Sequence, residues 1–360
     1  MFSVVMITRS TLYTVVGGDT VQVLQTARHL REAGVNVDIK CTNEPINYDR
    51  YTLLHFFNVI RPADILYHVK RSKKPYVVST VLVDYSEYDR HYRKGLLSVL
   101  FRLLPATETE YAKTMMRWLL GRDKLMDISY AWRGQQASVR AVLKNAAVLL
   151  PNSNSEQDRL VRQFGCTNAF VVVPNGIDET LFGKADENGR EEKLVICVAR
   201  IEGIKNQLNL IKALSGTEFR LILIGAAAPN QPKYYRQCRE AAGDNVLFVD
   251  HLPQEQLLSY YRRAKLHALP SFFETTGLSS LEAAAMGCNL VITDKGDTRA
   301  YFGDDAFYCD PADPGSIYRS VREAAAAPHP ESLQQKIHGQ YTWKEAAIKT
   351  LEAYHKTGLV

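Results

Sequence analysis

Short apolar runs alternate with amphipathic stretches along most of the chain, and this alternation predicts strands followed by helices. Residues 2–8 (FSVVMIT) predict a strand. Residues 21–34 carry apolar side chains at helical spacing as far as Gly34, and residues 35–40 (VNVDIK) predict the next strand. A strand, a helix and a strand in this order form a βαβ unit, and such units build parallel sheets.

The same alternation returns in the second half of the chain. The apolar runs there are continuous, as in LILIG and LVIT, which is typical of parallel strands buried on both faces. Strands are expected over 192–199, 219–225, 245–250, 265–270 and 288–294, and helices over 207–216, 253–264 and 278–287.

The chain length and one polar stretch predict two domains. A length of 360 residues fits about two domains of ordinary size. Residues 171–174 (VVVP) are expected to form the last strand of the first half, and 183–192 is the most loop-like stretch. We therefore expect domains over 1–174 and 175–340, followed by a C-terminal segment, 341–360, that contains a helix.

Composition excludes several classes of protein. Apolar residues make up 46% and charged residues 23%, which excludes disordered, collagenous and disulfide-stapled chains. The six cysteines lie at least 21 residues apart and mostly beside apolar runs, which favours small buried side chains and a reducing compartment. The nine histidines form no metal motif, so no metal site is expected. The N-terminus lacks a basic region, and no run approaches the ~20 apolar residues that span a bilayer, so we expect a cytoplasmic protein.

The net charge is concentrated in one segment. The whole chain has 44 basic and 39 acidic residues, a balance of +5, which is too weak to favour a nucleic-acid partner. Residues 90–124 hold eight Lys or Arg against three acids, so they carry the whole excess of +5. One interpretation is a pair of helices with a solvated basic face. The other is a peripheral contact with anionic lipid on the inner face of a membrane.

The most informative motif is SFFETTGLSSLEAAAMG, residues 271–287. Thr276 is expected to cap a helix that opens at Gly277-Leu278, where free backbone N–H groups and the helix dipole favour an anion. Glu274 precedes this helix, and Glu282 lies on it about five residues past Gly277. Two carboxylates around an anion site suit a sugar nucleotide, which has hydroxyls on either side of a diphosphate. The alternative is a capping acid and a solvated helix position.

Two further motifs carry weaker signals. In VARIEGIKNQ, Arg200 and Lys205 follow a strand that ends at Ala199, and ligands of doubly wound sheets bind at the carboxyl ends of strands. Two cations there would clamp a diphosphate as it leaves, unless they are ordinary loop charges. Gly17-Gly18 lacks the spacing of a dinucleotide-binding loop, so a plain turn is its alternative interpretation.

Taken together, these motifs resemble the family-4 retaining glycosyltransferases of GT-B fold. The resemblance rests on PNGID followed by Leu181 and Phe182, then ARIEGIKN, then the pair formed by Glu274 and Glu282 with seven residues between them. It covers about 150–310 strongly, 1–60 moderately and 85–145 faintly. It implies an α/β fold of two Rossmann-like doubly wound domains that face a cleft, with the C-terminal helix crossing back onto the first domain.

The resemblance also implies a role for each matching residue. Glu282 would hold the ribose hydroxyls of the donor nucleotide and Glu274 the hydroxyls of the donor sugar, while Leu252 lies where such enzymes place the base. The remaining candidates would bind the diphosphate through side chains or backbone amides: Arg200, Lys205, Thr276, Gly277, Leu278, Gly17 and Gly18.

One departure from the family concerns the first domain. Many members carry a histidine after the strand that matches PYVVST, whereas this chain reads VLVDYSEYDR. Asp84, Glu87 or His91 are the candidates to replace it.

The expected activity is transfer of a sugar, with retention and without a metal or other cofactor, from a nucleotide sugar to a glycan or lipid-linked acceptor in cell-surface polysaccharide synthesis. Two rival functions remain, a GT-B-shaped sugar-nucleotide epimerase and a non-catalytic sugar-nucleotide-binding subunit. An epimerase would share the two domains but not ARIEGIKN or PNGID.

Overall fold

The computed structural model describes residues 2–84, 86–91, 106–121, 123–183 and 189–359. The chain divides into two compact units. Unit 1 comprises residues 1–86, 95–175 and 343–360, and unit 2 comprises residues 87–94 and 176–342. The division falls at Asn175/Gly176, and the last helix belongs to unit 1. The expected division placed all of 1–174 in one domain, whereas residues 87–94 group with the second.

Unit 1 contains a five-stranded parallel sheet in the order β2-β1-β3-β4-β5. The chain places β2 on one side of β1 and then β3, β4 and β5 on the other side, which is the flavodoxin-like strand order. The strands are β1 (Ser3–Thr8), β2 (Asn36–Cys41), β3 (Leu53–Phe57), β4 (Tyr76–Ser79) and β5 (Val148–Leu150).

The helices of unit 1 follow the predicted alternation in its first part. In α1, the side chains of Val23, Ala27 and Leu30 recur at helical spacing and are buried, while Arg28 and Glu32 lie outside. The helical segments are α1 (Gly18–Glu32), η1 (Tyr48–Arg50), α2 (Pro62–Ser72), α5 (Ala106–Leu119), α6 (Tyr130–Asn145), α7 (Asn154–Phe164) and α15 (Trp343–His355).

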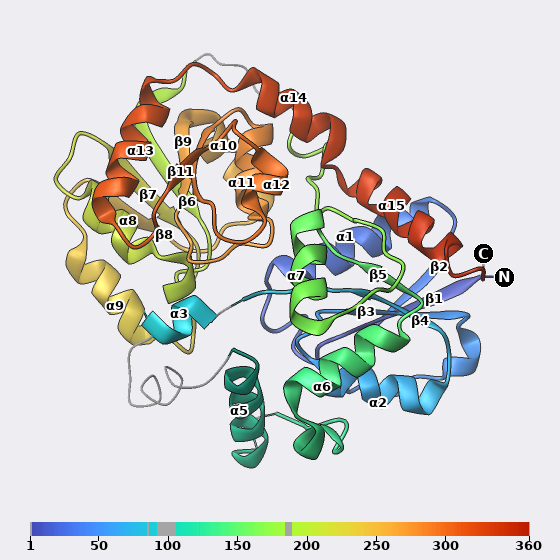
Figure 1. Ribbon diagram of the computed structural model, residues 1–360. Coiled ribbons are helices and arrows are strands. Elements are labelled where there is room, and N and C mark those ends of the chain that lie inside the picture. Colours follow the sequence, from blue (N-terminus) through green and yellow to red (C-terminus); the bar gives the residue numbers. More distant parts are fainter. Residues whose placement is uncertain (1, 85, 92–105, 122, 184–188, 360) are drawn as a thin grey trace. The chain divides into compact units, whose positions relative to one another are not determined.

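The C-terminal helix α15 is attached to unit 1 by a buried polar contact. It packs against α1 and β5, as Figure 1 shows for α1. His55, at the centre of β3, is fully buried, and its ring nitrogens are hydrogen-bonded to the hydroxyls of Tyr354 at 2.8 Å and Ser79 at 2.9 Å. Burial lowers the pKa of His55 to about 3, so the ring is neutral at physiological pH.

Unit 2 contains a six-stranded parallel sheet in the order β11-β10-β9-β6-β7-β8. Numbered within the unit, this is the 3-2-1-4-5-6 order of a Rossmann fold, with its switch point between β6 and β9. The strands are β6 (Glu191–Val198), β7 (Arg220–Ile224), β8 (Val246–Val249), β9 (Ala264–Leu269), β10 (Asn289–Thr293) and β11 (Phe307–Cys309).

The helices of unit 2 connect these strands. They are α3 (Ser86–His91, of which Glu87 onward groups with this unit), η2 (Gly203–Lys205), α8 (Gln207–Leu214), α9 (Pro232–Ala241), α10 (Gln254–Arg263), α11 (Leu278–Ala285), α12 (Thr298–Phe302), α13 (Pro314–Ala326) and α14 (Glu331–Gln340).

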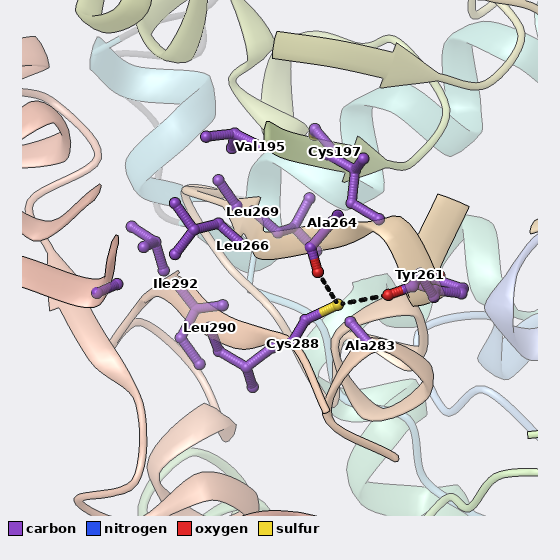
Figure 2. Packing of buried hydrophobic residues seen from close by; sticks show 14 of the residues in the cluster. Val195, Cys197, Tyr261, Ala264, Leu266, Leu269, Ala283, Cys288, Leu290 and Ile292 are labelled. Carbon is purple, nitrogen blue, oxygen red and sulfur yellow. Dashed lines mark hydrogen bonds between the residues drawn. The ribbon is translucent and has the colours of Figure 1, made fainter. Parts of the chain in front are cut away.

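The core of unit 2 confirms the interpretation of the cysteines as small buried side chains. All six cysteines of the chain are free and buried. In Figure 2, Cys197 and Cys288 lie among Leu266, Leu290 and other apolar side chains of β6, β9 and β10. The thiol of Cys288 donates hydrogen bonds to the carbonyl oxygens of Tyr261 and Ala264 at 3.2 and 3.4 Å. Its polar hydrogen is therefore satisfied inside an apolar layer.

One expected strand is absent from the described residues. Residues 171–174 were expected to form the last strand of the first half, but the last strand of that sheet is β5. The N–H groups of Val171 and Val173 donate to the carbonyls of Leu149 and Pro151, so the segment runs along β5 without forming a regular ladder. Phe170 forms a single parallel bridge with Leu149, so the segment pairs with β5 too briefly to count as a strand, and Val171 and Val173 are buried.

We expect Tyr354→Phe to destabilise unit 1. The substitution removes the hydroxyl that pairs with buried His55, and an unpaired buried polar group costs about 1–3 kcal/mol. The free energy of unfolding from a urea titration measures this loss. Tyr13→Phe, at an exposed tyrosine of the same unit, is the matched control and should change the free energy by less than about 0.5 kcal/mol. Equal effects of the two substitutions would contradict a role for His55 in holding α15.

Candidate active site

The candidate residues of unit 2 gather at the switch point of its sheet. Arg200 follows β6 by two residues, and Glu274 lies in the segment after β9, the strand that pairs with β6. The carboxyl ends of the two strands at a switch point border the crevice in which doubly wound sheets bind ligands. The topology therefore brings together two motifs that lie about 70 residues apart in sequence.

Lys205 and Glu274 form an ion pair across this point. The Lys205 Nζ atom lies 2.6 Å from Glu274 Oε1, and the Ser271 hydroxyl donates to the same oxygen at 2.6 Å. Glu274 is buried, whereas the Lys205 side chain is a quarter exposed. A buried carboxylate requires a compensating charge and hydrogen bonds, and Lys205 and Ser271 provide them.

The backbone around Glu274 is fixed by a close contact with Gly296. The Glu274 N–H donates to the Lys295 carbonyl at 3.2 Å, and the Asp297 N–H donates to the Glu274 carbonyl at 2.8 Å. Gly296 has φ of 94°, and a Cβ atom there would lie 2.0 Å from the Glu274 carbonyl oxygen. Only glycine allows the two segments to approach this closely.

The loop that carries the cations is held by its own polar contacts. Arg200 pairs with Glu202 at 3.0 Å. Asn206, in the left-handed conformation, donates from its side chain to the carbonyls of Pro270 at 3.0 Å and Pro311 at 2.6 Å. The loop after β6 is thereby tied to the segment after β9, which fixes the position of Lys205.

The start of α11, where an anion site was expected, has no side-chain cap. Its N-cap is Gly277, with φ of 74°, and no side chain caps the helix there. The expectation that Thr276 caps the helix is wrong, because its hydroxyl donates to the Tyr301 hydroxyl at 3.2 Å. The first turn, which begins at Leu278, therefore has backbone N–H groups with no side-chain cap.

Glu282 lies inside α11 and is engaged by two neighbours from α10. Its Oε1 accepts from the Gln254 side-chain amide at 2.8 Å, and its Oε2 accepts from the Tyr261 hydroxyl at 2.9 Å. Burial raises the pKa of Glu282 to about 7, although both hydrogen bonds act in the opposite direction. Among the described residues, no cation compensates this carboxyl group, and a pKa raised to about 7 makes Glu282 a candidate functional residue.

The structure places the remaining candidates in two regions. Leu252 is half-buried in the segment between β8 and α10, two residues before Gln254. Gly17 and Gly18 lie in unit 1, where Gly17 is the N-cap of α1. The structure thus joins Lys205 to Glu274 and places Arg200 after β6, the start of α11 after β9 and Glu282 within α11, with the two glycines in the other unit.

The loop that ends at Gly17 is organised by Arg9, at the carboxyl end of β1. The Arg9 guanidinium pairs with Asp19 at 2.6 Å and donates to the Val15 carbonyl at 2.7 Å. β1 borders the switch point of the first sheet, so this loop follows a strand end of the kind at which doubly wound sheets bind ligands.

The segment after β4, where the family's histidine is missing, is held by a buried acid. Glu156 accepts from the Thr80 hydroxyl at 2.6 Å and the Leu82 N–H at 2.7 Å. Val81 between them has φ of 43°, a strained conformation for a branched residue. Of the three replacement candidates, Asp84 is half-buried, and the side chain of His91 lies outside the described residues. Glu87 pairs with Lys295 in unit 2.

Sequence reasoning missed the residues that support the candidates. Ser271, Gln254 and Tyr261 each bond a candidate carboxylate. Ser271 lies within the quoted motif three residues before Glu274, at a spacing compatible with a tight turn. No sequence pattern indicates Gln254 or Tyr261, because their contact with Glu282 depends on how α10 packs.

The residues that the structure describes contain no group of three or more His, Cys, Asp or Glu side chains placed to hold a metal ion.

A family match falls within unit 2. Residues 179–339, which include the unit 2 candidates, match the family "Glycosyl transferases group 1". The fold of this chain is GT-B, with two parallel-sheet Rossmann-like domains, as the resemblance implied.

Two curated relatives and two solved structures are similar to the chain. D-inositol 3-phosphate glycosyltransferase of Corynebacterium glutamicum (strain R) is 27% identical over 324 residues, covering 76% of this chain and 75% of the relative. Glycogen synthase of Mycobacterium tuberculosis is 28% identical over 229 residues, covering 59% of this chain and 55% of the relative. The chain thus spans little more than half of the second relative.

Both solved structures share the fold over nearly the whole chain. Sucrose-phosphate synthase (tll1590) from Thermosynechococcus elongatus has a TM-score of 0.76 at 16% identity, covering 99% of each chain. Anabaena Alr3699/HepE in complex with UDP-glucose has a TM-score of 0.69 at 14% identity, covering 99% of this chain and all of that one.

We expect Glu282→Gln to stabilise the protein at alkaline pH. The pKa of Glu282 is about 7 in the folded protein and about 4.5 in the unfolded chain, so the folded protein binds its proton more tightly. The resulting contribution to the free energy of unfolding is complete below pH 4.5 and is lost as the pH rises through 7. The amide carries no charge to desolvate, so the variant should gain about 1–3 kcal/mol over the wild type at pH 8 and little at pH 4.

Urea titrations at both pH values measure this difference. Glu240→Gln, at an exposed position of α9, is the control and should be neutral at either pH. A variant that loses stability at pH 8 would contradict the origin of the raised pKa in burial.

Proposed function

We propose that this protein is a retaining, metal-independent glycosyltransferase that moves a sugar from a nucleoside diphosphate sugar to a glycan or lipid-linked acceptor. The observation that carries the proposal is the Lys205–Glu274 pair at the switch point of unit 2. The pair combines a cation for a diphosphate with a buried carboxylate for sugar hydroxyls. A similar structure, Anabaena Alr3699/HepE in complex with UDP-glucose, supports the donor class.

The donor diphosphate would lie at the start of α11. Its charge would be met by Arg200, Lys205 and the N–H groups of the first helical turn. Arg200 and Lys205 are each paired with one carboxylate, Glu202 and Glu274, so an arriving diphosphate would share or displace these partners.

The departing diphosphate gains negative charge in the transition state. Preorganised cations and amides at that position stabilise it selectively, which accelerates the step. Transfer on one face of the sugar would leave its configuration retained, and Glu274 would orient the sugar by accepting from its hydroxyls. The resemblance is the basis for retention.

Glu282 is suited to the ribose of the donor nucleotide. Its two oxygens accept hydrogen bonds from neutral donors, the amide of Gln254 and the hydroxyl of Tyr261. The hydroxyls of a ribose are neutral donors of the same kind. Leu252, next to the start of α10, would contact the base. These roles follow from the resemblance and fit the positions of the residues.

The acceptor is the least constrained part of the proposal. Cell-surface polysaccharide synthesis was the setting expected from sequence, whereas the names of the similar proteins refer to inositol phosphate, glycogen and sucrose phosphate. Acceptor tests should therefore include a polyol phosphate, a sugar phosphate and an oligosaccharide. An epimerase or a non-catalytic subunit is not favoured by these comparisons.

The test is release of free nucleoside diphosphate from a panel of nucleotide sugars, chosen by thermal shift, with and without each acceptor. Acceptor-dependent release is expected of a transferase. In this assay we expect Arg200→Ala and Lys205→Ala to lower kcat by about 10²–10³, as for loss of one preorganised donor. Lys205→Ala also leaves buried Glu274 without its cation and should lower the free energy of unfolding, so its kcat is referred to the folded fraction. Arg263→Ala, which removes an exposed ion pair with Glu191, should leave the rate unchanged.

Near-normal turnover of both variants would contradict the assignment of Arg200 and Lys205 to the departing diphosphate. The assay is run in EDTA as well, and a loss of activity that only magnesium or manganese restores would contradict transfer without a metal.

We also propose a peripheral contact between unit 1 and an anionic membrane. Much of the basic segment 90–124, including Arg93 and Lys94, lies outside the described residues. At its described end, Leu119 is 74% exposed, and the nearby Trp132 is 74% exposed as well. Exposed Leu and Trp beside Arg and Lys suit a lipid surface. No helix of the described residues is both long and apolar enough to cross a membrane.

Co-sedimentation with vesicles that contain phosphatidylglycerol, at low salt, tests this contact. We expect the wild type to bind these vesicles and Trp132→Ala to bind at least about threefold less, because it loses the largest exposed apolar group. Leu247→Ala, at an exposed apolar position of unit 2, is the control. Equal binding by the wild type and Trp132→Ala would support the solvated basic face instead.

A further inference from the structure

The short helix α3 carries residues from the first half of the chain onto unit 2. It spans Ser86–His91, and residues 87–94 group with unit 2. The sequence pointed to this helix only through Glu87 and His91, as candidates to replace the family's histidine. Its side-chain contacts, however, fall on the segments that hold Lys205 and Glu274.

Tyr88 contacts both of these segments. Its ring packs against Phe272, with the ring centroids 5.8 Å apart and the planes tilted by 37°. Its hydroxyl lies over Gly203, where a Cβ atom would be only 1.7 Å from the hydroxyl oxygen and 2.6 Å from Cζ. Gly203 begins η2, which ends at Lys205, and Phe272 precedes Glu274 by two residues.

These two segments are already joined by their backbones at this point. The Phe272 N–H donates to the Ile204 carbonyl at 2.9 Å. Tyr88 therefore covers the junction between the Lys205 loop and the Glu274 segment. Glu87 adds a contact with a third segment, because it pairs at 3.3 Å with Lys295, whose carbonyl accepts from the Glu274 N–H.

We propose that Tyr88 is a positioning residue for the diphosphate site: by packing on Phe272 and Gly203 it fixes the separation of the Lys205 loop and the Glu274 segment. This inference rests on the proposed function of that site. The ligand class is the diphosphate of a nucleotide sugar, and Tyr88 acts on it through Lys205. An ion pair held at a set separation presents its cation to a phosphate without reorganisation, and this is why the supporting contacts matter.

The absence of a side chain at position 203 is part of the arrangement. Any larger residue would occupy the place of the Tyr88 hydroxyl and push the ring away from Phe272. The backbone of Gly203 is itself fixed, since its N–H donates to the Gln231 side chain at 2.8 Å. The contact thus requires both a ring at position 88 and a glycine at position 203.

The experiment measures the affinity of the full chain for inorganic pyrophosphate and for UDP by calorimetry, together with the donor KM. Tyr88→Ala is expected to weaken pyrophosphate binding about tenfold and to raise the donor KM by a similar factor. Tyr88→Phe keeps the ring and should stay within about threefold of the wild type. Gly203→Ala should resemble Tyr88→Ala, because its methyl group displaces the ring.

The double variant Tyr88→Ala/Gly203→Ala separates this role from a general loss of stability. If both single changes act by removing one contact, the double variant should bind pyrophosphate no more weakly than Tyr88→Ala alone. Tyr318→Ala is the matched control, since it removes one ring of a similar pair with Phe219, at the start of β7 and away from the site. It should lower the melting temperature without changing pyrophosphate affinity.

Three results would overturn the inference: unchanged affinity and donor KM in Tyr88→Ala, tighter binding in that variant, which would make α3 an obstruction, or additive losses in the double variant. Failure of the proposed function looks different. In that case the wild type itself binds neither pyrophosphate nor UDP.

Discussion

The charge balance around one buried carboxylate determines the arrangement of unit 2. Glu274 lies beneath the surface, where an ionised carboxylate is costly without a cation and hydrogen-bond donors. Lys205 and Ser271 meet this requirement from two sides, and Asn206 ties the lysine loop to the segment after β9. The pair is therefore required by the burial of Glu274 and is, in the proposed reaction, the group that the diphosphate engages.

Different groups compensate the two buried acids of the motif. Glu274 has a cation, whereas Glu282 has only the neutral donors Gln254 and Tyr261 and a pKa raised to about 7. An acid that reduces stability at neutral pH, in a position where an amide would fit the same partners, is a stability cost of the kind that functional sites retain. This contrast favours different ligand groups for the two carboxylates.

Much of the fold could be predicted because its signals are local. The apolar runs and glycine-terminated helices of residues 191–293 indicate β6 to β10 within a few residues, and PNGID, ARIEGIKN and the glutamate pair indicate the site. Contacts that depend on packing could not be predicted. The cap of α11 is Gly277 instead of Thr276 because the threonine hydroxyl bonds Tyr301, and nothing in the sequence near Tyr88 indicates its contact with Phe272.

The last helix returns to unit 1 after the chain has completed unit 2, and the two ends of residues 176–342 meet. Ile177 pairs with Thr342 in a parallel bridge, and its N–H donates to the Tyr341 carbonyl at 2.8 Å. Unit 2 is thus inserted into unit 1 at two points of the chain that lie next to each other, as in proteins that tolerate the insertion of a whole domain. Recombination at this junction would join an existing unit 2, the donor side of the proposed reaction, to a new unit 1, and residues 87–94 would have to be matched to unit 2 as well.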